Sequence, residues 1–184
     1  MGLLVGIYDH LGWAVAVTAS SGHEVVDRRR IDLLEPSMPN MPIHHPERGR
    51  SLDEIEALVT RVRASAELAT SASFDSLTAA LPGPVTSVHL RALPADFPTD
   101  IAVQLRPPYE AQADAIMYRQ VLAAVATARG WTVRYYDAKT AEADAAAILG
   151  GRADEVLRSP RHRLGPPWTK DHRTALAATV LTGG

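Results

Sequence analysis

The chain has 184 residues, of which 46% are hydrophobic and 22% charged, and these values exclude a disordered or fibrous protein. Its formal charge of −2 excludes the broad positive field that drives non-specific binding to nucleic acid, so a nucleic-acid partner needs a local basic patch. The absence of cysteine excludes disulfides, thiolate zinc sites and a cysteine nucleophile. We expect residues 1–184 to form a single domain.

The start of the chain carries no pattern of a membrane or secretory segment. Residues 1–7 are apolar, but the run is too short to span a membrane and lacks the basic start and cleavage pattern of a signal peptide. We therefore expect a cytoplasmic protein with no membrane partner.

Three strands are predicted at the start of the chain. Apolar and β-branched residues dominate 3–8 and 12–18, and a third such run covers 24–33 after the turn Ser20-Ser21-Gly22. Short connections between consecutive strands favour antiparallel pairing, so we predict a three-stranded meander.

A proline-rich loop follows the meander. Four prolines between Glu35 and Pro46 exclude a helix and predict an extended surface loop over 35–50, long enough to suggest a function. His44 and His45 are neighbours in this loop, and in an extended segment they point to opposite sides, so at most one is expected to bind a given metal ion directly. A solvated pair of histidines is the alternative.

Helices and strands alternate in the rest of the chain. Ser51 and Glu54 form a capping-box pattern in front of apolar residues at helical spacing, which predicts a helix over 52–69. Gly130 suits the left-handed residue that ends a long helix. The further predicted elements are a helical stretch at 77–81, strands at 85–90 and 101–105, a helix over 107–129, a strand at 131–136, a helix over 138–149, a basic loop at 158–167 and a closing helix over 169–181. This order predicts an α/β protein whose later strands are parallel.

The densest group of ionisable residues lies at the start of the closing helix. Thr169 suits the N-cap, and the free N–H groups of the first turn attract anions. One interpretation has Lys170 and this turn receive a phosphate or carboxylate, with His172 as acid, base or metal ligand. The other has Asp171 complement the helix dipole while His172 pairs with a neighbour.

Asp9 and His10 lie at the link between the first two strands, where Asp is also a common turn residue. The carboxyl end of a central strand is where α/β sheets bind ligands. If Asp9, His10 and Asp171 converge there, two or three such ligands with water suit Mg²⁺, Mn²⁺ or Zn²⁺.

Several further residues are weighed against structural roles. Met117 is expected in the core and Arg119 in an ion pair, although Asp114, Tyr118 and Arg119 together could place a polar edge toward a cleft. Trp168 is expected to anchor the proline turn against the core. The basic residues between 158 and 163 form either a phosphate contact or a solvated loop.

Two segments resemble the Holliday-junction-resolvase branch of the ribonuclease H-like superfamily. Residues 5–15 look like its first hairpin and residues 170–177 like its last helix. The resemblance implies an α/β fold, a mixed sheet that begins with a three-stranded antiparallel meander and is flanked by helices. It also implies metal-dependent phosphodiester cleavage by acids on the first strand, the fourth strand and the last helix.

The chain departs from this acidic pattern at two of the three positions. Tyr8 stands where the first-strand acid is expected, and Asp9 comes one residue later, which on a strand is the other face. His89 stands where the fourth-strand acid is expected, and Asp171 matches the acid of the last helix. The whole chain also resembles a set of bacterial proteins that share the segments 42–45, 117–119 and 165–172, a resemblance that brings no activity with it.

Three functional hypotheses follow. The first is a ribonuclease H-like protein that binds nucleic acid or a nucleotide, or performs metal-assisted phosphoryl chemistry with Asp9, Asp171 and His172 as catalytic and metal-binding residues. The second is a non-enzymatic homodimer with the proline-rich loop and the closing helix at its interface. The third is a histidine-based hydrolase of a small anionic substrate. Further candidate site residues are His10, His44, His45, His89, Lys170 and Arg119.

Overall fold

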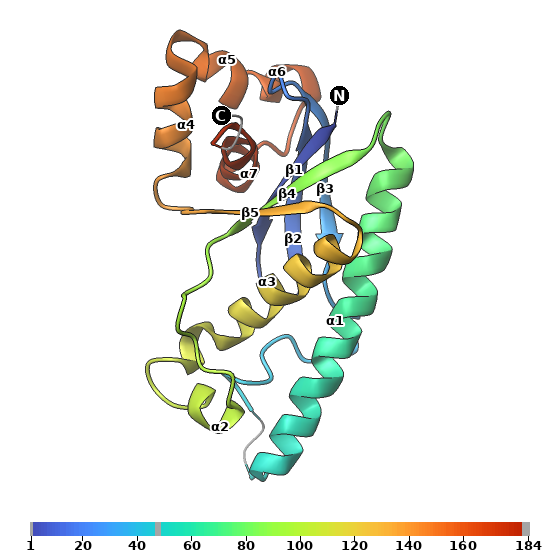
Figure 1. Ribbon diagram of the computed structural model, residues 1–184, viewed down its shortest axis with the longest axis vertical. Coiled ribbons are helices and arrows are strands. Elements are labelled where there is room, and N and C mark those ends of the chain that lie inside the picture. The colour runs from blue at the N-terminus through green and yellow to red at the C-terminus, as the bar shows by residue number, and fades with distance from the viewer. Residues whose placement is uncertain (1, 47–48, 182–184) are drawn as a thin grey trace.

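The computed structural model describes residues 2–46 and 49–181 and contains a five-stranded mixed sheet in the order β3-β2-β1-β4-β5 (Figure 1). β1 pairs antiparallel with β2, and β2 antiparallel with β3, while β4 runs parallel to β1 and β5 parallel to β4. The predicted meander and the parallel later strands are confirmed. The strands are β1 (Leu3–Asp9), β2 (Trp13–Ala19), β3 (Val25–Asp32), β4 (Val85–Arg91) and β5 (Thr132–Tyr136).

Seven α-helices and one short 3₁₀ helix are present in the described part of the chain. The predicted capping box of α1 is formed, since the Ser51 hydroxyl accepts from the Glu54 N–H and the Glu54 carboxylate accepts from the Ser51 N–H. The helices are α1 (Leu52–Ala80), α2 (Ile101–Gln104), α3 (Glu110–Ala128), α4 (Ala141–Leu149), η1 (Gly150–Arg152), α5 (Ala153–Leu157), α6 (Pro160–Leu164) and α7 (Lys170–Val180).

Three sequence predictions of secondary structure were wrong. The two helical stretches at 52–69 and 77–81 form one helix, because Thr70, Phe74 and Leu77 continue its buried face. The expected strand at 101–105 is the short helix α2, which begins where the Asp100 carboxylate accepts from the Ala102 N–H at 2.8 Å. The basic stretch at 158–167 contains the helix α6, with a proline in its first turn.

Helices cover both faces of the sheet, and the alternation of side chains along each strand divides the core in two (Figure 1). Val5 and Ile7 of β1 belong to the core under α1 and α3. Val15 and Val17 of β2 belong to the core under α4, α5 and α7. Each face of the sheet therefore has its own hydrophobic layer.

Helix α7 lies directly on the sheet at Gly6. A Cβ atom at Gly6 would lie 1.8 Å from the backbone oxygen of Ala175, so only glycine allows the helix to approach β1 this closely. Residues 174–180 of α7 are all buried. This part of the closing helix is covered within one chain, so only the first turn of α7 is accessible to a second copy, and the homodimer stays a prediction.

The proline-rich loop is held against α3. The buried carboxylate of Asp114 accepts from the backbone N–H groups of Ile43 at 3.1 Å and His44 at 2.9 Å. The Tyr118 hydroxyl donates to the backbone oxygen of Asn40 at 3.2 Å. The predicted polar edge of α3 thus fixes this loop, and Arg119 lies elsewhere.

No helix in the described part of the chain is both long enough and apolar enough to cross a membrane.

We predict that replacing Gly6 by alanine lowers the free energy of unfolding by about 3 kcal/mol or more, because the methyl group clashes with the backbone of α7. Urea unfolding measures this change. Gly151→Ala is the control, since no atom lies within 4 Å of the Cβ added there. Equal stability of the two variants would contradict the close approach of α7 and β1.

Candidate functional site

Asp9 is the last residue of β1, and two arginines hold its buried carboxylate. Its side chain is only 2% exposed. Arg91, at the end of β4, donates from Nε to Oδ1 at 2.7 Å and from Nη2 to Oδ2 at 2.6 Å. Arg119, on α3, donates from Nε to Oδ2 at 3.0 Å. Both carboxylate oxygens are therefore used, and the predicted ion pair of Arg119 is confirmed.

The same arginines also bind the backbone at this edge of the sheet. Arg91 Nη2 donates to the backbone oxygen of Asp9 at 2.7 Å, and Arg119 Nη1 donates to the backbone oxygen of Ala92 at 3.1 Å. The cluster therefore ties together β1, β4 and α3. Asp9 acts as the buried counter-ion of this junction.

Asp9 and Tyr8 belong to opposite faces of β1. Asp9 shares the strand alternation of Val5 and Ile7, whose core lies under α3. Tyr8 packs against the core under α7, and the Arg91 guanidinium lies 4.8 Å from the centroid of its ring. Asp9 is therefore on the face away from α7, as the register of the first strand predicts.

Of the three residues considered for convergence, Asp9, His10 and Asp171, only His10 and Asp171 contact each other, at the carboxyl end of β1. The distance from His10 Nε2 to Asp171 Oδ2 is 3.0 Å. The His10 ring stacks on Trp13 with centroids 4.0 Å apart and an interplanar angle of 10°. The Arg30 guanidinium lies 4.3 Å from the centroid of the same Trp13 ring. Arg30, Trp13, His10 and Asp171 thus form a continuous cluster of charged and aromatic groups.

His172 pairs with the N-cap residue of its own helix. Its Nδ1 lies 2.8 Å from the Thr169 hydroxyl and 3.3 Å from the Thr169 backbone nitrogen, whose hydrogen it accepts. Burial, together with the nearby Arg28, lowers the pKa of the largely buried His172. The lowered pKa favours the neutral ring, and the alternative in which His172 pairs with a neighbour describes its contacts. Lys170 is exposed in the first turn of α7.

His89 is buried under α7, away from solvent. Its Nε2 lies 2.9 Å from the Ser87 hydroxyl. Burial and the charge of Arg134 lower the pKa of His89 to about 4, so the ring is neutral at pH 7. A neutral, buried imidazole at this position does not supply the negative charge that the resemblance assigns to the fourth strand.

His44 and His45 lie on a turn rather than on an extended segment. The His45 N–H donates to the backbone oxygen of Met41 at 3.2 Å, and the two rings have centroids 4.2 Å apart. The prediction that they point to opposite sides was wrong, because the Asp114 carboxylate binds the backbone here and the chain curves. Neither histidine is among the residues that line the pocket described next.

A pocket of about 440 Å³ opens between the first turn of α7 and the strands β2 and β3. Arg28 borders it and donates to the backbone oxygens of Leu164, at 2.8 Å, and Gly165, at 3.0 Å, and also to those of Pro166 and Pro167. Arg28 thus holds the proline turn in place, while Trp168 anchors it as predicted, with Nε1 bonded to the Leu157 backbone oxygen at 2.9 Å. The lining residues used below are Trp13, Val15, Arg30, Asp171 and His172.

The arrangement does not fit a shared divalent cation on Asp9, Asp171 and His172. Asp9 is bound by two arginines, Asp171 by His10, and the Nδ1 atom of His172 by Thr169. Within residues 2–46 and 49–181, no group of three or more His, Asp or Glu side chains could hold a metal ion. The three residues predicted to bind Mg²⁺, Mn²⁺ or Zn²⁺ therefore do not form a shared metal site in the described part of the chain.

Three arginines at the site, Arg91, Arg30 and Arg28, were not among the residues predicted from the sequence. Arg91 directly follows the predicted strand at 85–90, and Asp9 lies at the end of the first strand. Because the carboxyl ends of parallel strands share one edge of a sheet, the two residues could be expected to lie close together. Arg28 and Arg30 are two residues apart in β3 and therefore face the same side. Both signals were available in the sequence.

The chain matches no protein-family model and no curated protein. Among solved structures it is similar to Thermus thermophilus RuvC in complex with a Holliday junction substrate, with 13% identity, coverage of 98% of this chain and 92% of that chain, and a TM-score of 0.50. Another structure of Thermus thermophilus RuvC has 13% identity, coverage of 97% and 92%, and a TM-score of 0.47. The chain therefore has a ribonuclease H-like fold, and the fold implied by its two terminal segments is confirmed.

We predict that Asp9→Asn lowers the free energy of unfolding by about 3–5 kcal/mol, because it leaves two guanidinium groups without their buried counter-charge. Urea unfolding measures the loss. The control is Asp32→Asn, since Asp32 and its partner Arg30 have side chains 73% and 61% exposed, and there we expect less than about 1 kcal/mol. Similar small losses in both variants would show that Asp9 is not a structural counter-ion.

Proposed function

We propose that the chain binds nucleic acid at the carboxyl end of β1, on the face covered by α7, without cleaving it by the metal-dependent route that the resemblance implies. The observation that carries this proposal is the contact of Asp9 with Arg91 and Arg119. It leaves the α7 face of β1 without a first-strand acid. Phosphate groups can therefore approach this face without repulsion from that carboxylate.

Cationic and aromatic groups support binding on this face. Arg30 is exposed on β3, and Lys170 is exposed in the first turn of α7. Both are free to reach phosphate oxygens, since the contacts of Arg30 to Asp32 and to Trp13 lie on the surface. Arg30 also lines the pocket at α7, whose accessible surface is mainly apolar, with Trp13 and Val15 among its lining residues, and which suits an unstacked base.

The comparison with known structures selects the first ligand to test. A protein of the same fold has been solved with a Holliday junction bound to it. A branched DNA is therefore the first probe, with duplex and single-stranded DNA and RNA as comparisons. The charge of −2 on the whole chain means that binding depends on the local groups and weakens steeply with salt.

A histidine-based hydrolase is the second candidate, favoured by the contact of His10 with Asp171 at 3.0 Å. A carboxylate beside an imidazole can orient it as a general base. The atom that would accept a proton is His10 Nδ1, because Nε2 faces Asp171. His172 is the residue that the sequence suggested as acid or base, but its Nδ1 atom is bound to Thr169.

Fluorescence anisotropy with labelled four-way junction, duplex and single strands tests the proposal. We expect Arg30→Gln and Lys170→Gln each to weaken binding by about tenfold at low salt, because each removes a charged phosphate contact. Arg61→Gln on the exposed surface of α1 is the matched control and is expected to bind like the natural chain. Equal affinity of all four proteins, or no binding of any probe, would refute the proposal.

A cleavage assay on the same probes separates the alternatives. We expect no product with Mg²⁺ or Mn²⁺. Metal-dependent cleavage that is lost in Asp171→Asn would establish the phosphoryl chemistry that the first hypothesis allowed. Metal-independent hydrolysis that is lost in His10→Gln would favour the second candidate.

A further inference from the structure

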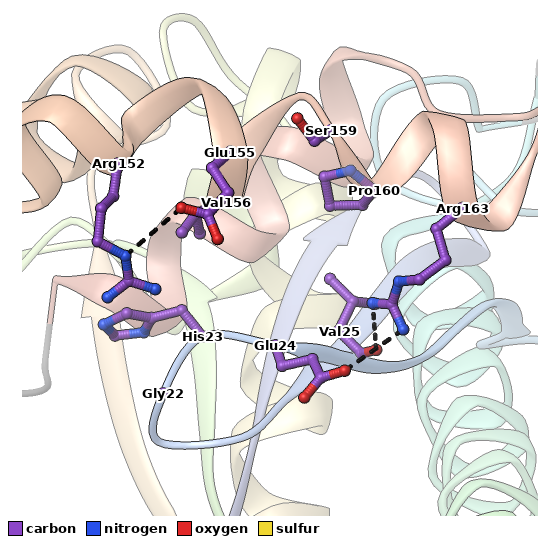
Figure 2. Close-up of a pocket in the computed structure, with 10 residues that line it drawn as sticks. All are labelled: Gly22, His23, Glu24, Val25, Arg152, Glu155, Val156, Ser159, Pro160 and Arg163. Atoms are coloured by element: carbon purple, nitrogen blue, oxygen red, sulfur yellow. Dashed lines mark hydrogen bonds and ion pairs between the residues drawn. The ribbon is translucent and has the colours of Figure 1, made fainter.

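A second pocket, of about 480 Å³, lies at the other end of the sheet from Asp9 (Figure 2). One wall is the turn that joins β2 to β3, and the other is formed by α5 and α6. This turn follows Ala19, whose partner in β1 is Leu4, whereas Asp9 at the far end pairs with Ala14. The pocket is therefore separate from the candidate site above, and its volume is that of a small-molecule site.

His23 has an unusual backbone and an unpaired side-chain nitrogen. Its φ angle is 70°, and it is the one residue other than glycine with a positive φ in the described part of the chain. The left-handed region favours glycine, and a histidine there adds strain to the turn. Its Nδ1 atom is buried and has no hydrogen-bond partner. The His23 side chain lines the pocket, while its buried Nδ1 atom lacks the partner that a buried polar atom normally has.

Arg152 lies beside His23 at one end of the pocket, with its guanidinium over the imidazole ring (Figure 2). Burial, and to a lesser extent Arg152, lower the pKa of His23. The contact of Arg152 to Glu155 is 3.7 Å long, and both side chains are more than half exposed, at 58% and 72%. Such a pair is weak, so a phosphate oxygen can replace the carboxylate.

The other end of the pocket has a second arginine and a second acid. Arg163 donates to the backbone oxygen of Val25 at 3.1 Å and contacts Glu24 at 3.5 Å (Figure 2). Glu24 can accept hydrogen bonds from hydroxyl groups. The buried side chains of Val156 and Pro160 form an apolar wall between the two ends.

We propose that this pocket binds a small phosphate monoester that carries hydroxyl groups, such as a phosphorylated sugar or a mononucleotide. The phosphate lies at Arg152 and His23, and the hydroxyl groups lie at Glu24 and Arg163. The apolar wall contacts the carbon skeleton or the base. This site is independent of nucleic-acid binding at the carboxyl end of β1.

Isothermal titration calorimetry with ribose 5-phosphate, adenosine monophosphate, ribose and inorganic phosphate tests the proposal. We expect at least one of the two phosphate esters to bind, and ribose not to bind. Arg152→Gln should weaken ester binding by about tenfold or more, because it removes a charged hydrogen-bond donor. The control Arg161→Gln changes the same charge on α6 outside the pocket and should leave affinity unchanged.

His23→Gly separates function from folding. Glycine relieves the positive φ, so we expect the melting temperature to rise while ester binding falls. A variant that is more stable but binds less tightly cannot owe its lost affinity to unfolding. The proposal is overturned if neither ester binds at millimolar concentration, if ribose binds as tightly as its phosphate, or if Arg152→Gln and His23→Gly keep full affinity.

Discussion

The pairing of one buried carboxylate with two guanidinium groups determines how this structure can act. Asp9 ends the central strand, Arg91 ends the neighbouring parallel strand, and Arg119 projects from the helix that covers one face. Burying any of these charges alone would be strongly unfavourable, so each residue depends on the others. The carboxyl edge of the sheet, where α/β proteins bind ligands, is thus fixed by a charge cluster.

The same pairing means that this chain has the ribonuclease H-like fold without the acidic metal site that the resemblance implies. In the family that the two terminal segments resemble, the acid of the first strand and the acid of the last helix are expected on the same face of the sheet. Here Tyr8 occupies that face of β1, Asp9 points to the other, and Asp171 contacts His10. The pocket at α7 is lined by arginine, histidine and tryptophan side chains, with Asp171 as the one acid among its described lining residues, and this set suits binding of phosphates and bases more than cleavage.

Local sequence patterns predicted much of the fold but few of the site's contacts. The capping box at Ser51, the left-handed residue Gly130 and the alternation that places Asp9 opposite Tyr8 depend on neighbouring residues, and all three were predicted correctly. The partners of Asp9 are 82 and 110 residues away along the chain. The shared carboxyl edge of two parallel strands points to Arg91, but no spacing rule identifies Arg119 as a partner of Asp9. The expected strand at 101–105 failed because Asp100 begins a helical turn that overrides the β-propensity of its apolar residues.

The central claim is that Asp9 is a counter-ion and not a metal ligand, and the carboxyl ¹³C resonances of Asp9 and Asp171 test it most directly. Mg²⁺ is diamagnetic, and on binding it changes the chemical shift of the carboxylates that ligate it. In a Mg²⁺ titration of the folded protein, we predict that the Asp9 resonance keeps its chemical shift, because both of its oxygens are held by Arg91 and Arg119. A saturable shift of Asp9 and Asp171 together, with the same dependence on Mg²⁺ concentration, would contradict the claim.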